Sequence, residues 1–229
     1  MKSWISQSAL ALLLLTQLIA MPACSQPKDK TTTDATQAAS ASEAQKDLSG
    51  LHKAYFASGC FWCVEAVFES VEGVEEAVSG YSGGTEANPT YRQVSSGATS
   101  HAEAVLVYYD STIVDFPTLV KVYYGSHDPT TANRQGPDRG PQYRSIAFYE
   151  NDTEKKIIED YIQSLYESGE YAQGEIVTEV TKFDKFWEAE DYHQDYERNN
   201  PDNPYIRSVS IPRLKKFQAK YPELLKGSH

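Results

Sequence analysis

The sequence predicts an α+β fold built on a ferredoxin-like βαββαβ sandwich, with a mostly antiparallel sheet, helices on one side, long functional loops and an irregular C-terminal extension. Two features predict this class. Stretches with strand-like and helical patterns follow one another in the order strand, helix, strand, strand, helix, strand. Two long glycine-containing segments without periodicity interrupt that order, and such segments in a compact domain usually carry function. The 229 residues suffice for one medium-sized domain and an N-terminal targeting segment.

Residues 1–23 are typical of a signal peptide. Lys2 precedes a largely apolar run, Ala9 to Ala20, that is too short for a comfortable membrane span. The segment from Met21 to Ser25 resembles the lipobox of bacterial lipoproteins, with methionine where that pattern usually has leucine. Two alternatives therefore stay open, a lipid anchor on Cys24 or ordinary secretion. Both predict an exported protein of the periplasm or cell envelope, anchored to a membrane only if Cys24 is lipidated.

Residues 24–50 are expected to form a flexible tether, because they are rich in Ser, Thr, Ala, Gln, Lys and Asp and contain no aromatic residue. The folded domain is expected over residues 51–229. Lys and Arg total 21 against 32 Asp and Glu, giving a net charge of −11, and no basic stripe interrupts this balance. We therefore expect a soluble monomer that does not bind nucleic acid.

The first part of the domain is expected to contain two strands around a helix. Lys53 to Ala57 have the composition of a short strand. Apolar residues then recur at helical spacing as far as Val71, so a helix is expected to begin at or beside Cys60. A second strand is expected from Val74 to Ser79, and glycines then mark an irregular stretch from Gly80 to Gly97.

The remaining elements follow from the same two periodicities, with a polar N-cap marking the start of the longest helix. In chain order we expect a strand from Ala102 to Tyr109, a helix from Phe116 to Tyr124, an irregular stretch from Ser126 to Gln142, a strand from Arg144 to Tyr149, a helix capped by Thr153 and running to about Tyr166, a strand from Glu175 to Val180, and short helical pieces at Ala189–Arg198 and Pro212–Tyr221.

The expected domain contains one pair of cysteines, Cys60 and Cys63. A cysteine at the start of a helix lies where free N–H groups and the helix dipole favour negative charge, so Cys60 is a candidate nucleophile with a stabilised thiolate. Cys63 follows one turn later, and side chains three residues apart on a helix have Cβ atoms roughly 5–6 Å apart. A disulfide between them needs modest local adjustment, and the pair can store two electrons.

The spacing alone leaves several functions open. A Cys-x-x-Cys pair also suits a thioredoxin-like disulfide oxidoreductase, half of a zinc site, or a structural clip in a lipid-tethered binding module. Zinc is the weaker alternative, because the chain has no second cysteine pair and its five histidines show no paired ligand spacing. A thioredoxin-like fold would leave the two irregular stretches unexplained.

Seven short motifs resemble, in order and at similar spacing, those of the A-type peptide methionine sulfoxide reductase family. Together they extend from about Tyr55 to Tyr205. The resemblance implies reduction of the S epimer of methionine sulfoxide, free or in proteins, and hence repair of oxidised proteins without a bound cofactor or metal. The motifs are Gly59-Cys60-Phe61-Trp62, Gly80-Tyr81-Ser82-Gly83-Gly84, Asn88-Pro89-Thr90-Tyr91, His101-Ala102-Glu103-Ala104-Val105, His127-Asp128-Pro129, Arg134-Gln135-Gly136-Pro137-Asp138 and Gln142-Tyr143-Arg144-Ser145.

The resemblance also assigns roles to individual residues. Sulfoxide reduction needs a thiolate to attack sulfur, an acid to protonate the oxygen, and hydrogen-bond donors around that oxygen. Cys60 would be the nucleophile, and Glu103 would be the acid, kept protonated by partial burial. The hydroxyls of Tyr91 and Tyr143 would donate to the oxygen, with Asp138 as polar support.

Three aromatic residues complete the expected site. Phe61 and Trp62 would wall an apolar pocket for the methyl group of the methionine. His193 also lies in a segment that matches the family, and we expect its role to be structural.

The chain departs from the commoner pattern of that family in its recycling cysteines. Many members resolve the sulfenic acid with cysteines near the C-terminus, where this chain has none, and many have glycine at the position of Cys63. Both departures fit a Cys60–Cys63 disulfide with Cys63 as the resolving cysteine. A thioredoxin-type or equivalent exported dithiol would then reduce it. Direct resolution by a small thiol, with Cys63 as a bystander, remains the alternative.

Overall fold

The computed structural model describes residues 46–227. The expected signal peptide, Cys24 and most of the expected tether lie outside the described residues. The compact unit begins at Lys46, before the expected domain start at Leu51, and Lys46 Nζ donates to the carbonyl of Glu75 at 2.8 Å. Within the described part of the chain, no helix has the length and apolar character needed to cross a membrane.

A six-stranded sheet forms the centre of the fold, in the order β7-β6-β1-β3-β2-β8. Every neighbouring pair is antiparallel except β6 and β7, which are parallel. The expected mixed α+β fold with a mostly antiparallel sheet is therefore confirmed. The strands are β1 (His52–Ser58), β2 (Val74–Ser82), β3 (Ala102–Tyr109), β6 (Ser145–Tyr149), β7 (Glu179–Lys182) and β8 (Phe186–Glu188), and a separate two-stranded hairpin pairs β4 (Arg134–Gln135) with β5 (Asp138–Arg139).

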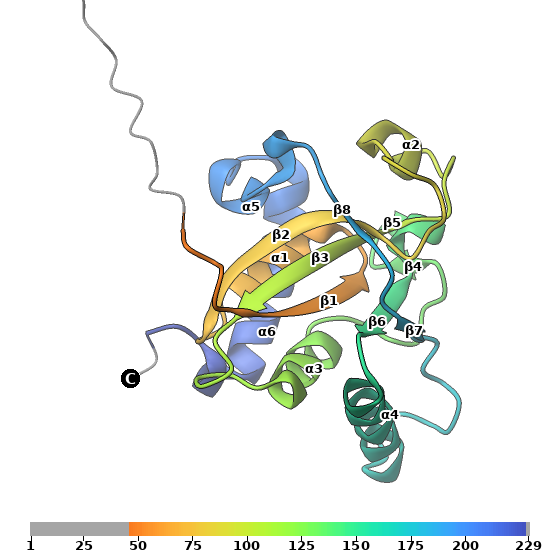
Figure 1. Ribbon diagram of the computed structural model, residues 1–229, viewed down its shortest axis with the longest axis vertical. Helices are drawn as coiled ribbons and strands as arrows, with labels where there is room; N and C mark the ends of the chain where they lie inside the picture. Colours follow the sequence, from red (N-terminus) through yellow and green to blue (C-terminus); the bar gives the residue numbers. More distant parts are fainter. Residues whose placement is uncertain (1–45, 228–229) are drawn as a thin grey trace, which may run out of the picture. The chain divides into compact units, whose positions relative to one another are not determined.

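The helices are distributed along the whole described chain. In Figure 1, α1 and α6 lie behind the strands β1, β2 and β3. The helices are α1 (Phe61–Glu69), α2 (Tyr91–Ser95), α3 (Phe116–Gly125), α4 (Asp152–Glu167), α5 (Tyr196–Asn199) and α6 (Ile211–Lys220), with a π-helical turn at Ile206–Ser210 and 3-10 turns at Pro141–Tyr143, Asp191–His193 and Pro222–Leu224.

Alternating residues of the central strands supply two apolar clusters, one on each face of the sheet. Phe56 of β1 and Val105 of β3 belong to the larger cluster, together with the buried side of α1. Tyr55 and the other residues of opposite parity belong to the smaller cluster, which Phe183 and Phe186 cover. The rings of Tyr55 and Phe183 stack with their centroids 3.6 Å apart. The face with the larger cluster is the one that carries the functional residues.

The predicted boundaries are wrong at the N-termini of α4 and β7. The cap of α4 is Asn151, whose side chain accepts the N–H of Glu154 at 3.0 Å, so the helix begins before Thr153. β7 begins at Glu179 instead of Glu175, because the preceding backbone pairs elsewhere: the N–H of Val177 donates to the carbonyl of Pro129 at 2.9 Å.

The first irregular stretch is shorter than predicted, because β2 continues through Gly80 to Ser82. Gly80 pairs with β3 on one side and with β8 on the other. An added Cβ there would lie 2.3 Å from the ring of Phe186, so glycine marks a close approach between strands at this position and not a turn. The short helix α2, which lies within this stretch, was not predicted. The strand β8, much later in the chain, was not predicted either.

Candidate active site

Cys60 lies between the end of β1 and the first turn of α1. Its carbonyl accepts the N–H groups of Cys63 and Val64 at 3.2 and 3.3 Å, which makes it the N-cap residue that was expected. Gly59 turns the chain into this position with φ of +89°, a conformation that L side chains rarely adopt. The thiol is buried, with 7 % of the residue exposed.

A side chain at position 59 is predicted to disturb the nucleophile. In Gly59→Ala the new Cβ would lie 2.5 Å from Cβ of Gln135 and would keep the unfavourable positive φ. We expect the variant to lose about 1–3 kcal/mol of unfolding free energy, measured by urea denaturation, and to react more slowly at Cys60. Gly97→Ala is the matched control for φ alone, since its φ is +72° but nothing lies near the added Cβ. Equal losses in both variants would contradict a specific clash at position 59.

Cys60 opens onto a cavity of about 260 Å³. This cavity brings together every catalytic or substrate-binding residue predicted from the sequence except Cys63. Asn203 and Tyr205, from the C-terminal part of the chain, complete the lining. The predicted residues that line it are Cys60, Phe61, Trp62, Tyr91, Glu103, Asp138 and Tyr143.

Glu103 is the buried carboxyl of this cavity. It belongs to β3, and only 1 % of the residue is exposed. One carboxyl oxygen, Oε2, accepts the N–H of Phe61 at 3.0 Å, which ties the carboxyl to the first residue of α1. Burial raises its pKa to about 8, although the Phe61 N–H opposes the shift. Glu103 is therefore protonated at neutral pH and can donate a proton into the cavity.

Two tyrosines line the same cavity from different segments. Tyr91 is the first residue of α2, and its N–H donates to Glu190 Oε1 at 3.0 Å. Tyr143 ends the 3-10 turn after β5. Burial raises the pKa of Tyr91 to about 12 and also raises that of Tyr143, so both hydroxyls keep their protons as hydrogen-bond donors.

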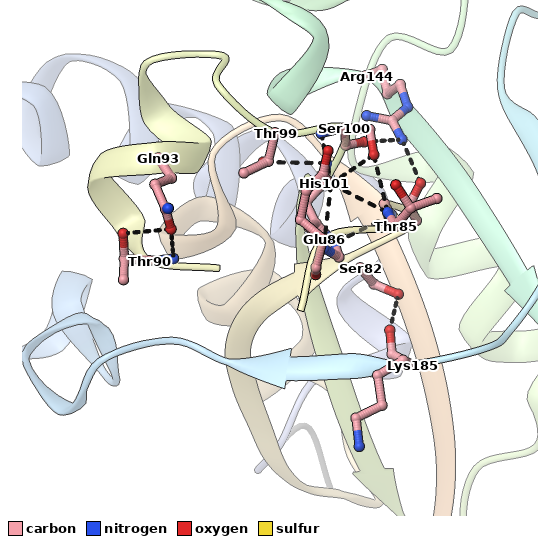
Figure 2. Close-up of polar contacts among 12 residues, drawn as sticks. Ser82, Thr85, Glu86, Thr90, Gln93, Thr99, Ser100, His101, Arg144 and Lys185 are labelled. Carbon is pink, nitrogen blue, oxygen red and sulfur yellow. Dashed lines mark hydrogen bonds and ion pairs between the residues drawn. The ribbon is translucent and has the colours of Figure 1, made fainter. Parts of the chain in front are cut away.

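The loop that carries Tyr91 is held to the sheet by polar contacts at its two ends (Figure 2). Buried His101 accepts the N–H of Gly84 at 3.2 Å through Nδ1, and its Nε2 lies 2.7 Å from the carbonyl of Glu86. Arg144 Nη2 donates to the carbonyls of Gly83 and Ser100, at 3.2 and 3.0 Å. These bonds fix both ends of the loop and thereby limit where Tyr91 can lie.

The aromatic wall of the cavity is organised around His193. The Trp62 indole donates to His193 Nδ1 at 3.2 Å, and burial lowers the pKa of His193, so the imidazole remains neutral as the acceptor. The His193 ring centroid lies 5.0 Å from that of Phe61 and 4.2 Å from that of Tyr91. Tyr196 stacks on Trp62 at 3.7 Å. The arrangement agrees with the structural role expected for His193.

Cys63 faces a different space. It does not line the cavity of Cys60 but lines a larger cavity of about 690 Å³, together with Arg213 of α6. Asp138 and Tyr205 line both cavities. The Tyr205 hydroxyl lies 3.7 Å from Cys63 Sγ and donates to Asp138 Oδ2 at 2.6 Å.

Sequence reasoning did not single out Tyr205 or Arg213. Tyr205 is one of 16 tyrosines and marked only the end of the family resemblance, while Arg213 lies in an unremarkable polar helix. No local pattern distinguishes either residue. Asp138, in contrast, was found through its motif, and the structure shows that its partner is Tyr205.

The two thiols share a hydrogen bond and titrate differently. Burial raises the pKa of the Cys60 thiol well above its ordinary value, and the hydrogen bond to Cys63 raises it further. The same hydrogen bond, with help from the Arg213 charge, lowers the pKa of Cys63 to about 6. Burial of the Cys60 thiol thus opposes the stabilisation of its thiolate that the helix N-terminus was expected to provide.

An acidic cluster formed by two residues of α1 and Asp195 is the one group of three or more His, Cys, Asp or Glu among residues 46–227 whose ligand atoms are close enough to hold a metal ion. It consists of Glu65, Glu69 and Asp195, with the ligand atoms within 4.8 Å of one another. Burial raises the pKa of Glu65 to about 8 and that of Glu69 to about 7. Protons therefore neutralise much of this cluster at neutral pH, and its residues take no part in the thiol site.

Comparison with known proteins identifies relatives over most of the described chain. A family model described as peptide methionine sulfoxide reductase matches residues 52–225. The peptide methionine sulfoxide reductase MsrA of Natronomonas pharaonis is 48% identical over 165 residues, covering 72% of this chain and 92% of that protein. MsrA 1 of Rhodopirellula baltica is 47% identical over 183 residues, covering 80% of this chain and 94% of that protein.

Solved structures show the same similarity. Reduced Mxr1 from Saccharomyces cerevisiae superposes with a TM-score of 0.62 at 30% identity, covering 67% of this chain and 87% of that one. Methionine sulfoxide reductase A of Corynebacterium diphtheriae gives a TM-score of 0.59 at 36% identity, covering 67% and 76% of the two chains.

Proposed function

Because this chain belongs to the peptide methionine sulfoxide reductase family, we propose that Cys60 attacks a methionine sulfoxide held in the cavity onto which its thiol opens. The enzyme reduces methionine sulfoxide to methionine, a reaction that repairs oxidised proteins. One observation carries the assignment of residues: a buried thiol, a protonated carboxyl and two tyrosine hydroxyls line a single small cavity. In a binding module whose Cys-x-x-Cys pair is only a structural clip, there would be no need for these groups to line one cavity.

The first step transfers the sulfoxide oxygen to Cys60. As Cys60 attacks the substrate sulfur, its proton passes to the hydrogen-bonded Cys63 thiolate. Glu103 protonates the sulfoxide oxygen, and the Tyr91 and Tyr143 hydroxyls donate to that oxygen while charge develops on it. Methionine leaves, and Cys60 remains as a sulfenic acid.

The walls of the cavity account for recognition of the methionine. Phe61, of which 1 % is exposed, and Trp62 give it an apolar side suited to the methyl group on sulfur. With the oxygen directed to Glu103 and the tyrosines, and the methyl group to the aromatic wall, one configuration at sulfur fits. We assign this fit to the S epimer.

In the second step Cys63 resolves the sulfenic acid. It gives up the proton it received, attacks the Cys60 sulfur, and the hydroxyl group leaves as water, which forms the Cys60–Cys63 disulfide. The low pKa of Cys63, about 6, supports this role, since the thiolate is the nucleophile. Tyr205 lies next to Cys63, and its bond to Asp138 gives Asp138 a role in holding that hydroxyl in place. A dithiol of the thioredoxin type then restores both thiols.

Substitution of the acid is predicted to slow the first step. Glu103→Gln retains a hydrogen-bond donor but cannot release a proton, so we expect the single-turnover rate to fall about 10²-fold. Glu103 is protonated below its pKa of about 8, and its contribution as an acid is lost as the pH rises through that value. The rate ratio of wild type to variant, which cancels the thiol titrations, should therefore decline above pH 8. Rapid-quench assays of methionine formation between pH 6 and 10 measure this rate ratio. A ratio that stays constant across this range would exclude Glu103 as the acid.

The activity itself is tested with purified enzyme, dithiothreitol and a peptide containing one methionine sulfoxide as separated epimers. We expect loss of the S epimer and persistence of the R epimer, followed by chromatography. Consumption of both epimers would contradict the fit proposed for the cavity, and consumption of neither would contradict the reaction.

We further propose that the enzyme is exported to the periplasm or cell envelope and acts there as a monomer on oxidised proteins. The signal-like segment at 1–23 supports export, and Cys24 is its candidate lipidation site. Mass spectrometry of the mature N-terminus tests this: a diacylglyceryl adduct on Cys24 is expected if the protein is anchored. An unprocessed Met1 would contradict export.

We also propose a ferredoxin-like unit within the sheet. The four strands β6, β1, β3 and β2 support this description, because they are adjacent in that order and all antiparallel to their neighbours. β7 and β8 then extend the unit at its two edges.

A further inference from the structure

The cavity of Cys60 adjoins the larger cavity beside it. Asp138 and Tyr205 line both spaces, and the Tyr205 hydroxyl donates to Asp138 Oδ2 at 2.6 Å, so these two side chains form a shared wall. We propose that the larger cavity binds the polypeptide that flanks a methionine sulfoxide residue in an oxidised protein. The inference rests on the proposed reaction at Cys60 and adds the surface that distinguishes a protein substrate from the free amino acid.

The smaller cavity has the size of a side-chain site. Its volume of about 260 Å³ lies below the roughly 300–1,000 Å³ of pockets that take a whole drug-sized ligand. The reacting groups are also deep, since only 7 % of Cys60 and 1 % of Glu103 are exposed. When the sulfoxide reaches Cys60, the residues on either side of it in a polypeptide must therefore lie against the surface around this cavity.

The larger cavity offers such a surface next to the reacting groups. Its volume of about 690 Å³ falls within the range of pockets that enclose a ligand as large as a short peptide segment. Each residue of an extended chain adds about 3.3–3.6 Å of reach, so the adjoining space is within the first few residues of the sulfoxide. The cavity is open to solvent, because its lining includes exposed Asp128, Pro137, Ser208, Pro212 and Lys216.

The lining of the larger cavity combines apolar surface with a charged rim, as protein interfaces do. Half-buried Tyr171 and Val209 supply part of the apolar surface. On the rim, Glu170 is already paired with Lys220, at 3.3 Å. Lys216 makes no ion pair or hydrogen bond with any of residues 46–227, so its ammonium is free to donate to the occupant. A polypeptide supplies both apolar side chains and backbone carbonyls that accept from an ammonium.

Single-turnover measurements without reductant test the inference, because they report on the substrate alone. The reduced enzyme is mixed with the S epimer of N-acetyl methionine sulfoxide amide, or with peptides that extend it by three alanines on each side, and methionine is measured after rapid quench. We expect the peptide to react with a second-order rate constant at least about tenfold higher, because remote binding energy assists the reaction. Equal rate constants overturn the inference. If neither compound yields methionine, the proposed function has failed instead.

Two neighbouring lysines of α6 give a matched pair of variants. Both are exposed, and Lys216 lines the larger cavity whereas Lys215 does not. We expect Lys216→Trp to lower the single-turnover rate constant for the peptide about tenfold and that for the N-acetyl amide less than about twofold. Lys215→Trp should change neither by more than about twofold. Circular dichroism and the thermal midpoint verify that both variants are folded.

The same variants separate the substrate from other occupants of the cavity. Equal losses with the peptide and the N-acetyl amide in Lys216→Trp would place its effect in the Cys60 cavity and overturn the inference. An unchanged single turnover with the peptide, combined with slower steady-state turnover when thioredoxin is the reductant, would assign the cavity to the reductant and would also overturn it.

Discussion

Replacing Cys60 with serine is expected to abolish methionine formation, in the first turnover as well as in the steady state. A serine hydroxyl does not attack sulfoxide sulfur under these conditions, and it cannot carry the oxygen away as a sulfenic acid. Rapid-quench measurement of methionine per enzyme should therefore give zero. The effect is the largest expected for any single substitution in the chain.

The third cysteine supplies a matched control for this change. Cys24→Ser makes the same chemical substitution in the expected tether, before the compact unit that begins at Lys46. We expect full activity in the purified Cys24 variant. Residual turnover in Cys60→Ser, or a comparable loss in Cys24→Ser, would contradict the assignment of Cys60 as the nucleophile.

Replacing Cys63 with serine is expected to limit the enzyme to one methionine per molecule when thioredoxin is the reductant. The sulfenic acid on Cys60 then has no neighbouring thiol with which to condense, so the Cys60–Cys63 disulfide that thioredoxin would reduce does not form. The first methionine should also appear more slowly, because Cys60 loses the thiolate that accepts its hydrogen bond.

The stalled enzyme can be observed directly. Mass spectrometry of Cys63→Ser after one turnover should show an added oxygen, which a sulfenic acid probe captures, whereas the wild type should show the loss of two hydrogens. Adding a small thiol in place of thioredoxin tests the alternative of direct resolution. Unimpaired multiple turnover of Cys63→Ser with thioredoxin would show that Cys63 is a bystander.

Much of this architecture follows from local sequence patterns. Strand-like composition located β1 and β3, and the helical spacing after Gly59 located α1, because these elements bury continuous apolar runs or faces. The motifs predicted one site for Glu103, Tyr91 and Tyr143, and all three residues line the same cavity. The pattern was ambiguous at Gly80, where a glycine that signals a turn instead allows two strands to approach closely.

The remaining features depend on contacts between distant segments, which periodicity does not encode. Tyr205 reaches Cys63 across 142 positions of the chain, and Trp62 reaches His193 across 131. The raised pKa of Cys60 was also beyond the sequence, because the residues around its thiol come from segments as far apart in the chain as Glu103 and Tyr205. The separation of the two sulfurs into different cavities depends on the same packing.

Several residues that enclose the two thiols are synthesised long after the cysteines themselves. Cys60 and Cys63 leave the ribosome early, whereas Asp138, Tyr205 and Arg213 follow much later. Domains are completed only as their last segments emerge. Until then both thiols are open to any oxidant or thiol-modifying enzyme that the nascent chain meets. Slow synthesis of the C-terminal segment thus lengthens the time for which the two thiols of this repair enzyme are open to oxidation.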